Sequence, residues 1–190
     1  MTTDYLIFVD DDEVFEQDAL SKITNAFKEK DADAFVFNYK VINKKRGYKE
    51  YHGPIKKCSK KELMSTGVVR FVYKTSSIKD MLFDEKIGSG SEFLCGEDSV
   101  FINDFLKKTK KCYFCEDFIC TISQEGSLWK DKIDTDNYLY VKGYVYKKIY
   151  GILYKLACLH FLKKTKRFSK VNYKKMKNGP KKVKEFYENR

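Results

Sequence analysis

The chain has 190 residues, of which 43% are hydrophobic and 16% aromatic. That much apolar material can fill the core of an ordinary domain, which excludes a disordered chain. The net charge of +11 is concentrated at one end, because residues 163–190 hold 12 of the 38 Lys and Arg but only 2 of the 27 Asp and Glu. The remaining body is nearly neutral and has no recognised nucleic-acid-binding motif, so no nucleic-acid partner is expected.

Hydrophobic periodicity predicts a mixed α/β domain. Residues 6–9 form an apolar run that is typical of a strand buried on both faces. The strands expected after it are residues 32–43, 68–74 and 110–120, and helical segments are expected at residues 16–30, 59–64, 75–83 and 96–108. From residue 138 to 162, apolar residues recur at spacings of three and four, which predicts one long amphipathic helix. No run reaches the ~18 apolar residues of a membrane span.

Six cysteines in a chain that does not start with a signal peptide indicate reduced thiols and a cytoplasmic protein. Cys112 and Cys115 have a zinc-ligand spacing, with Cys120 nearby. However, no second Cys-x-x-Cys follows, and His52 and His160 are the only histidines. The segment is more typical of a strand that uses cysteine as a small apolar residue, and a zinc site is the alternative.

A cluster of acidic residues follows the first expected strand. Asp10, Asp11 and Asp12 belong to a group of seven carboxylates within residues 1–18, where there is no Lys or Arg. Such crowding raises carboxylate pKa values or recruits a cation. Because ligands bind outside the carboxyl ends of strands in open α/β sheets, we predict a Mg²⁺ or Mn²⁺ site with a phosphate ligand. The alternative is that Asp12 caps the next helix.

A second acidic point, Glu97 and Asp98, stands at the expected start of a helix. Carboxylates are favoured at a helix N-terminus, so capping is one interpretation. The preceding loop, IGSGSEFLCGED, is rich in glycine and can bring its backbone close to a ligand. A carboxylate that faces this ligand could accept the proton of an attacking hydroxyl as a general base.

Four segments resemble the family 2 glycosyltransferases, which use nucleotide-sugar donors on the GT-A fold. YLIFVDDDEVF resembles the strand that ends in their Asp-x-Asp metal motif. LFDEKIGSGSEFLCGEDSVFINDFLKKTKKCYF resembles their acceptor loop and catalytic Glu-Asp segment, and ISQEGSLW and YLYVKGYVY resemble what comes next. The resemblance spans residues 4–165. It implies an α/β, GT-A-like (Rossmann-like) mixed sheet flanked by helices in residues 4–137, followed by an amphipathic, basic helical tail in residues 138–190.

The resemblance also implies a role for each matching residue. Asp12 and Asp10 would hold Mg²⁺ or Mn²⁺, and with Asp11 they would bind the nucleotide-sugar donor. Asp98, with Glu97 beside it, would deprotonate the acceptor in an inverting transfer. The acceptor side would be lined by Gly88, Gly90, Ser91 and Trp129. The implied activity is sugar transfer to a glycan or lipid-linked acceptor in the synthesis of bacterial surface polysaccharides.

The chain departs from that family in two ways. The segment FICTISQEGSLW lacks the late histidine that completes the metal site of many GT-A enzymes. The strand-helix units that bind the nucleoside, which come before the Asp-x-Asp strand in the family, are missing here. We therefore expect an N-terminally truncated domain, an exposed strand edge at residues 6–9, and an inactive protein when the chain is alone.

FVDDDEV also resembles the first motif of the haloacid-dehalogenase-like phosphatases. In that family Asp10 would be the nucleophile and Asp12 the acid/base of a Mg²⁺-dependent phosphatase. The later motifs of these phosphatases are not evident in the chain, so this interpretation is the alternative. A glycosyltransferase remnant that serves only as an interaction module is a further alternative.

The expected helix of residues 138–162 and the basic tail have the layout of a peripheral membrane anchor. The apolar face of the helix would enter the interface, and the Lys and Arg of the tail would contact anionic lipid. Members of the family that use lipid-linked acceptors often end in this way, which implies a location on the inner, cytoplasmic face of the cell membrane. The alternative is that the helix packs on the domain and the tail is solvated.

Overall fold

The computed structural model describes residues 3–42, 49–63, 66–109, 111–123 and 135–189. The chain divides into two compact units. The first comprises residues 1–81 and 104–127, and the second comprises residues 82–103 and 128–190. Helix α4 (Glu97–Lys108) begins in the second unit and ends in the first.

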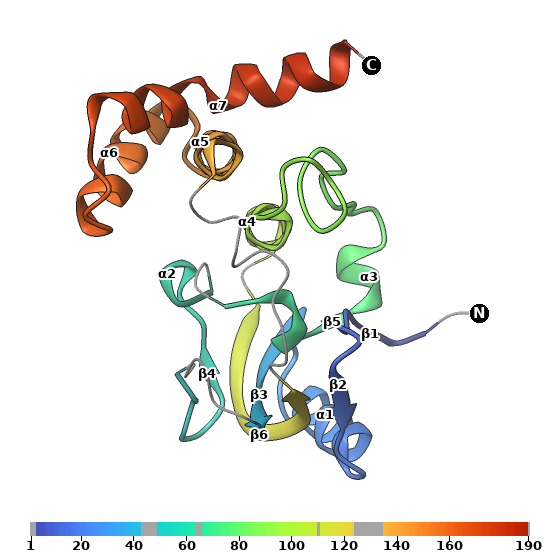
Figure 1. Ribbon diagram of the computed structural model, residues 1–190. Coiled ribbons are helices and arrows are strands. Elements are labelled where there is room, and N and C mark those ends of the chain that lie inside the picture. The colour runs from blue at the N-terminus through green and yellow to red at the C-terminus, as the bar shows by residue number, and fades with distance from the viewer. Residues whose placement is uncertain (1–2, 43–48, 64–65, 110, 124–134, 190) are drawn as a thin grey trace. The chain divides into compact units, whose positions relative to one another are not determined.

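The first unit is built on a mixed sheet in the order β1-β5-β3-β6-β2, with β4 also paired to β6. Strands β3 and β6 are parallel and lie side by side in Figure 1, whereas the other pairs are antiparallel. The strands are β1 (Tyr5–Ile7), β2 (Glu13–Phe15), β3 (Ala34–Ile42), β4 (Lys56–Lys57), β5 (Phe71–Lys74) and β6 (Cys112–Ser123).

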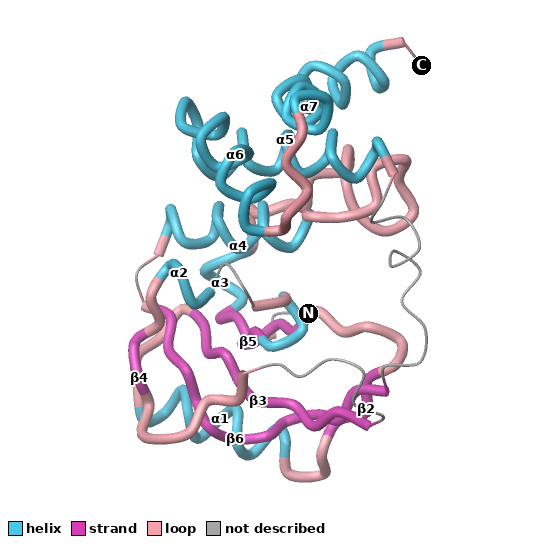
Figure 2. Tube along the Cα trace, turned by 60° about the vertical axis from the view of Figure 1, so that its left-hand side comes forward, coloured by secondary structure: helices cyan, strands magenta, loops and turns pink. Residues whose placement is uncertain are grey.

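Helix α1 (Ala19–Glu29) covers one face of this sheet (Figure 2). Its Ile23 and Ala26 pack with Phe35 and Phe37 of β3 and with Ile119 of β6 in a buried cluster. Because side chains alternate along a strand, Phe35 and Phe37 can share this face. The short helices of the unit are α2 (Lys60–Leu63), η1 (Val68–Arg70) and α3 (Thr75–Ile78).

A buried polar network occupies an irregularity in the β3–β6 pairing. The register shifts on both sides of Asn38, whose side chain donates to the carbonyl oxygens of Tyr51 (2.8 Å) and Glu116 (2.9 Å). The Asn38 Oδ1 accepts from Arg70 at 3.1 Å, and Arg70 Nε donates to the Phe37 carbonyl oxygen at 2.9 Å. Since buried polar groups are costly unless they are hydrogen-bonded, this network holds the chain at Tyr51 against the sheet.

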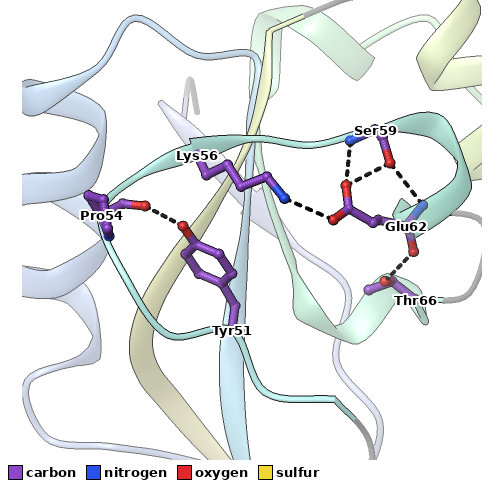
Figure 3. Close-up of polar contacts among 6 residues, drawn as sticks. All are labelled: Tyr51, Pro54, Lys56, Ser59, Glu62 and Thr66. Carbon is purple, nitrogen blue, oxygen red and sulfur yellow. Dashed lines mark hydrogen bonds and ion pairs between the residues drawn. The ribbon is translucent and has the colours of Figure 1, made fainter.

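Helix α2 begins with a capping box, shown in Figure 3. The backbone N–H and the hydroxyl of Ser59 donate to Glu62 Oε2 at 2.9 and 2.6 Å, and the Glu62 N–H donates back to Ser59 Oγ at 3.3 Å. Lys56 Nζ donates to Glu62 Oε1 at 3.0 Å. These hydrogen bonds from Ser59, followed by that from Lys56, lower the pKa of Glu62 from 4.5 to about 2.

We expect Ser59→Ala to destabilise the first unit by about 1 kcal/mol, the usual effect of losing an N-terminal cap. A carboxylate with a lowered pKa stabilises the fold above the pKa of the unfolded chain, and this contribution is lost as the pH falls through the folded pKa. Glu62→Gln should therefore melt below the wild type at pH 7, and the difference should vanish between about pH 4.5 and 2. Thermal melts followed by circular dichroism would check this, and a difference that persisted at pH 2 would contradict it.

The second unit begins with a loop that leads to the start of α4 at Glu97, and its other described elements are helices. Its helices are α5 (Asp136–Tyr150), η3 (Gly151–Leu153), α6 (Tyr154–Lys164) and α7 (Lys170–Glu188), together with the start of α4. Helices α5 and α7 cross closely, because a Cβ at Gly143 would overlap the carbonyl oxygen of Met176 and a Cβ at Gly179 would overlap that of Tyr140. Only glycine permits this approach of the two backbones.

Two expectations for the helices and strands are corrected. The helix expected at residues 138–162 is two helices, since the chain changes direction at Gly151, whose φ is +56°. The apolar face of α5, including Val141 and Val145, is buried in the second unit, so this face packs on protein and does not enter a membrane. Strand β1 is only partly buried, because it is a terminal strand of the sheet order and Val9 beyond it is 54% exposed.

Candidate functional site

The three consecutive aspartates lie between two strands of the first unit. Strand β1 ends at Ile7 and β2 starts at Glu13, with Asp11 and Asp12 in the turn just before β2. The Asp12 carbonyl oxygen accepts a hydrogen bond from the Ser123 N–H of β6 at 3.0 Å. Helix α1 begins later, with Asp18 in the position before its first residue. The alternative that Asp12 caps this helix is therefore wrong.

Negative charge accumulates around this turn. Burial, and then the charges of Asp12 and Asp11, raise the pKa of Asp10. Burial raises the pKa of Glu13 to about 7, and the nearby charges of Asp10 and Asp12 add to this effect. Both carboxyl oxygens of Glu13 are buried, and an interaction with the Asp10 backbone opposes the rise in the pKa of this group. Sequence reasoning did not single out Glu13, although it is the next acid in the run and the first residue of β2.

The donor set of this turn fits a hard divalent cation in part. Crowded carboxylates with raised pKa values gain from a cation, and carboxylate oxygens are the ligands that Mg²⁺ and Mn²⁺ prefer. Across the described parts of the chain, no three acidic, His or Cys side chains converge on one metal position. The aspartates would therefore supply some of the ligands of a cation and leave the others to a phosphate or to water.

The glycine-rich loop of the second unit is organised around Glu97. Gly88 and Gly90 have φ values of +116° and +84°, and a Cβ at Gly88 would come within 2.9 Å of the Glu97 carboxyl carbon. The Ser89 N–H donates to Glu97 Oε1 at 3.4 Å. Glu97 is thus turned back onto the loop, and Asp98 is the next residue in the first turn of α4.

Hydrogen bonds inside the loop fix Ser91. Its hydroxyl donates to the Gly88 carbonyl oxygen at 2.9 Å and accepts from the Phe93 N–H at 3.1 Å. The Gly88 N–H donates to the Phe93 carbonyl oxygen at 2.9 Å. The structure therefore brings Gly88, Gly90 and Ser91 together in one loop, whereas Trp129 lies outside the described residues.

Helix α5 holds the segment that contains this loop at two points. Tyr144 donates its hydroxyl to Asp84 Oδ2 at 2.7 Å, and Lys148 pairs with that oxygen at 3.0 Å. Burial opposes the ionisation of Asp84, but these two partners keep its pKa below the ordinary value. Near the tip, Asn137 donates to Glu92 at 2.6 Å. The loop is thus held in one conformation by residues that are distant in the sequence.

A cavity of about 270 Å³ opens between this loop and the start of α5. Its lining combines hydroxyl, carboxyl and amide groups with apolar side chains, a mixture suited to a polar ligand of modest size. Burial raises the pKa of Cys95 in its wall, so this thiol is neutral at pH 7. Of the expected acceptor residues that the structure describes, Ser91 lines the cavity and Gly88 and Gly90 do not; the other lining residues are Glu92, Leu94, Cys95, Thr135, Asn137, Tyr138 and Val141.

The cysteines considered as zinc ligands lie in strand β6. Cys112, Cys115 and Cys120 are buried, as expected for small apolar residues in a strand. Burial raises the pKa of the Cys115 and Cys120 thiols to about 12. Zinc binds thiolates, so this environment disfavours the zinc alternative.

Comparisons with known proteins agree with this architecture. Residues 1–87 match the family model described as glycosyl transferase family 2. Three crystal structures of S. aureus TarS 1-349 share the fold. The complex with UDP-GlcNAc has a TM-score of 0.64 at 15% identity, over 90% of this chain and 51% of that one. A second TarS 1-349 structure has a TM-score of 0.62 at 15% identity, over 90% of this chain and 50% of that one. The complex with UDP has a TM-score of 0.60 at 16% identity, over 89% and 49%.

No curated protein sequence matches the chain. The chain spans about half the length of the TarS 1-349 structures. The matched region contains β1 and the three aspartates and ends at Ile87, one residue before Gly88. This match favours the glycosyltransferase interpretation of the acidic turn over the phosphatase interpretation. Residues 1–87 of the chain are therefore similar to the family 2 glycosyltransferases, and the chain as a whole shares the fold of the TarS structures.

Proposed function

We propose that this chain carries the metal-binding, base and acceptor elements of an inverting, metal-dependent glycosyltransferase. The reaction is transfer of a sugar from a nucleotide-sugar donor to a hydroxyl of a glycan or lipid-linked acceptor in bacterial surface polysaccharide synthesis. The observation that carries this proposal is the crowded Asp10–Asp12 turn after β1, inside the region that matches the glycosyl transferase family 2 model. The shared fold with TarS, solved with UDP-GlcNAc, supports a uridine-diphosphate sugar as the donor.

On the donor side, Asp12 and Asp10 would hold Mg²⁺ or Mn²⁺, and Asp11 would contact the donor. Bound there, the cation would neutralise charge on the departing nucleoside diphosphate. The raised pKa of Asp10 supports this role, because a carboxylate that is crowded by like charges gains most from a nearby cation. A cation bound nearby would likewise favour the ionised form of Glu13, whose pKa burial raises to about 7.

On the acceptor side, Asp98 would take the proton of the acceptor hydroxyl while the oxygen of that hydroxyl forms a bond to the anomeric carbon of the donor sugar. The bond from that carbon to the diphosphate breaks on the opposite face, which inverts the configuration. Glu97 would act as a positioning residue, because its carboxyl holds the loop at Gly88 and Ser89. The cavity beside Ser91 would receive part of the acceptor.

We also propose that the protein works on the cytoplasmic face of the cell membrane, where a lipid-linked acceptor is available. Among the helices that the structure describes, none has the length and apolar character needed to cross a bilayer. The basic residues of α6 and α7 suit anionic lipid instead, as a peripheral contact.

Binding of Mn²⁺ tests the donor side without a complete reaction. We expect electron paramagnetic resonance titration to detect Mn²⁺ binding, and UDP to strengthen it. Asp12→Ala should weaken Mn²⁺ binding by about tenfold or more, because it removes a direct oxygen ligand. Asp18→Ala is the matched control, since Asp18 is in the same unit but pairs with Lys22 at 2.9 Å.

Equal Mn²⁺ binding by the wild type and Asp12→Ala would refute the metal role of this turn. Mg²⁺-dependent hydrolysis of a phosphomonoester, lost in Asp10→Asn, would instead favour the phosphatase alternative. Metal binding with no transfer under any condition would favour a remnant that has lost catalysis.

A further inference from the structure

The junction of α5 and α6 exposes a run of large apolar side chains. Tyr150 is 46% exposed, Ile152 87%, Leu153 59% and Leu156 65%. We call these four residues the α5–α6 corner. Isolated exposed apolar residues are common on protein surfaces, but several that are adjacent in one short segment indicate a contact surface.

The buried clusters of the second unit do not include the corner residues, although Tyr150 packs edge-on against Tyr146 at a ring distance of 5.6 Å. Helix α5 buries Leu139, and α6 buries Cys158 and Leu162, which pack with Met176 of α7. Helix α7 buries Met176 and Val183, and Val171 in its first turn is 60% exposed. The corner therefore holds four of the large apolar side chains that this helical packing leaves exposed, and the other two on these helices and their connection are Phe168 and Val171.

All the charged side chains of α5 and α6 are basic except Asp136, the first residue of α5. Between Asp136 and Glu185 the sequence contains no Asp or Glu. Lys147 lies over the Tyr154 ring at 5.1 Å, next to the corner, and Lys155 lies within it and is exposed. Lys148 faces an acid from another segment, Asp84, at 3.0 Å and is thereby partly neutralised. The further basic residues of α6 and its end are Lys163, Lys164, Lys166 and Arg167.

We propose that the α5–α6 corner is the surface that inserts into an anionic lipid bilayer. An apolar tip with a basic surround is the chemistry that suits the boundary between acyl chains and negatively charged headgroups. A second copy of the chain is a poorer occupant, because joining two such corners would bring lysines of like charge together. A nucleic acid would satisfy the lysines but would leave Ile152 and Leu156 in water.

This inference rests on the proposed membrane location but not on the transfer chemistry. It assigns the contact to residues 150–156, whereas the sequence pattern placed it on the apolar face of the whole helical segment. Vesicle binding needs neither donor nor acceptor, so its failure and a failure of sugar transfer are separate results.

The test is sedimentation of the full chain with vesicles of phosphatidylcholine and phosphatidylglycerol, and with vesicles of phosphatidylcholine alone. We expect binding to the anionic vesicles, weakened by salt, and little binding to the neutral ones. Ile152→Ser combined with Leu156→Ser should lower the partition coefficient about tenfold or more, because both side chains leave water on insertion. Leu82→Ser should leave binding unchanged, since the Leu82 side chain, at 90%, is more exposed than Ile152 and Leu156 but lies outside the corner.

Several results would overturn the inference. One is a wild type that does not sediment with anionic vesicles at low salt. Another is a double variant that binds as well as the wild type, which would leave charge alone as the cause of binding. A concentration-dependent dimer that the double variant abolishes, measured by analytical ultracentrifugation without lipid, would assign the corner to a second copy. Thermal melts of the variant, whose substituted residues are exposed, would verify that the second unit is folded.

Discussion

Asp98→Asn is expected to lower sugar transfer by about 10²- to 10⁴-fold, the usual contribution of a general base. The amide keeps the size of the side chain but cannot accept the acceptor's proton as a carboxylate does. Asp98 is in the first turn of α4, directly after the loop that Glu97 holds in place. The measurement is the release of UDP from UDP-GlcNAc, with Mn²⁺ and a polysaccharide or lipid-linked acceptor present, in a preparation whose wild type transfers sugar, so that the expected inactivity of the chain alone does not hide the effect.

Two variants on the same helix sharpen this result. Asp104→Asn is the matched control, because its carboxylate pairs with Lys107 at 2.6 Å on the helix surface, and it should leave transfer unchanged. Glu97→Gln should raise the acceptor KM more than it lowers kcat, since Glu97 organises the loop at Gly88. Transfer by Asp98→Asn at the wild-type rate would exclude the base role.

The sequence predicted most of the elements of the first unit because their determinants are local. The aromatic and β-branched run of β3 and the helical periodicity of α1 need no distant information. The resemblance to family 2 glycosyltransferases is carried by short motifs, and it anticipated the match of residues 1–87. The mixed sheet with flanking helices follows from the same alternation of elements.

Other features depend on partners far along the chain. Strand β2 was missed because Val14 and Phe15 alone are too short an apolar run to predict a strand. Residues 13–15 form a strand because they pair with Ile122, Thr121 and Cys120 of β6. That pairing places Asp12 in a turn instead of at a helix start. The break at Gly151 was missed because the apolar spacing continues across it.

The candidate site was predictable only in its chemistry. The acids and glycines could be recognised by type, and the structure places Gly88, Gly90 and Ser91 in one loop next to Glu97. The contacts that hold this loop were beyond sequence reasoning, because Asp84 meets Tyr144 and Glu92 meets Asn137 across long stretches of chain. No local pattern distinguishes such polar residues from ordinary surface residues.

Replacing Gly143 by alanine is expected to destabilise the second unit by about 2 kcal/mol or more. In an ordinary helix this change stabilises by roughly 0.5–1 kcal/mol, because glycine loses more entropy on folding. Here the added Cβ would overlap the Met176 carbonyl oxygen of α7, and overpacking typically costs about 1–3 kcal/mol. Pro180 has no N–H to offer that carbonyl within α7, so the oxygen is directed at the α5 backbone instead. Urea denaturation followed by circular dichroism measures the loss.

Asn178→Ala serves as the control, and it should raise the free energy of unfolding slightly. Asn178 is exposed in α7 beside Gly179, and alanine has a higher helix propensity than asparagine. Gly179→Ala should behave like Gly143→Ala, since its Cβ would overlap the Tyr140 carbonyl oxygen. The two glycine variants together should lose less than the sum of their separate effects, because the first already forces the helices apart. Stabilisation by Gly143→Ala would show that α5 and α7 do not meet as closely as the structure places them, and the loop that α5 holds would then lose its support.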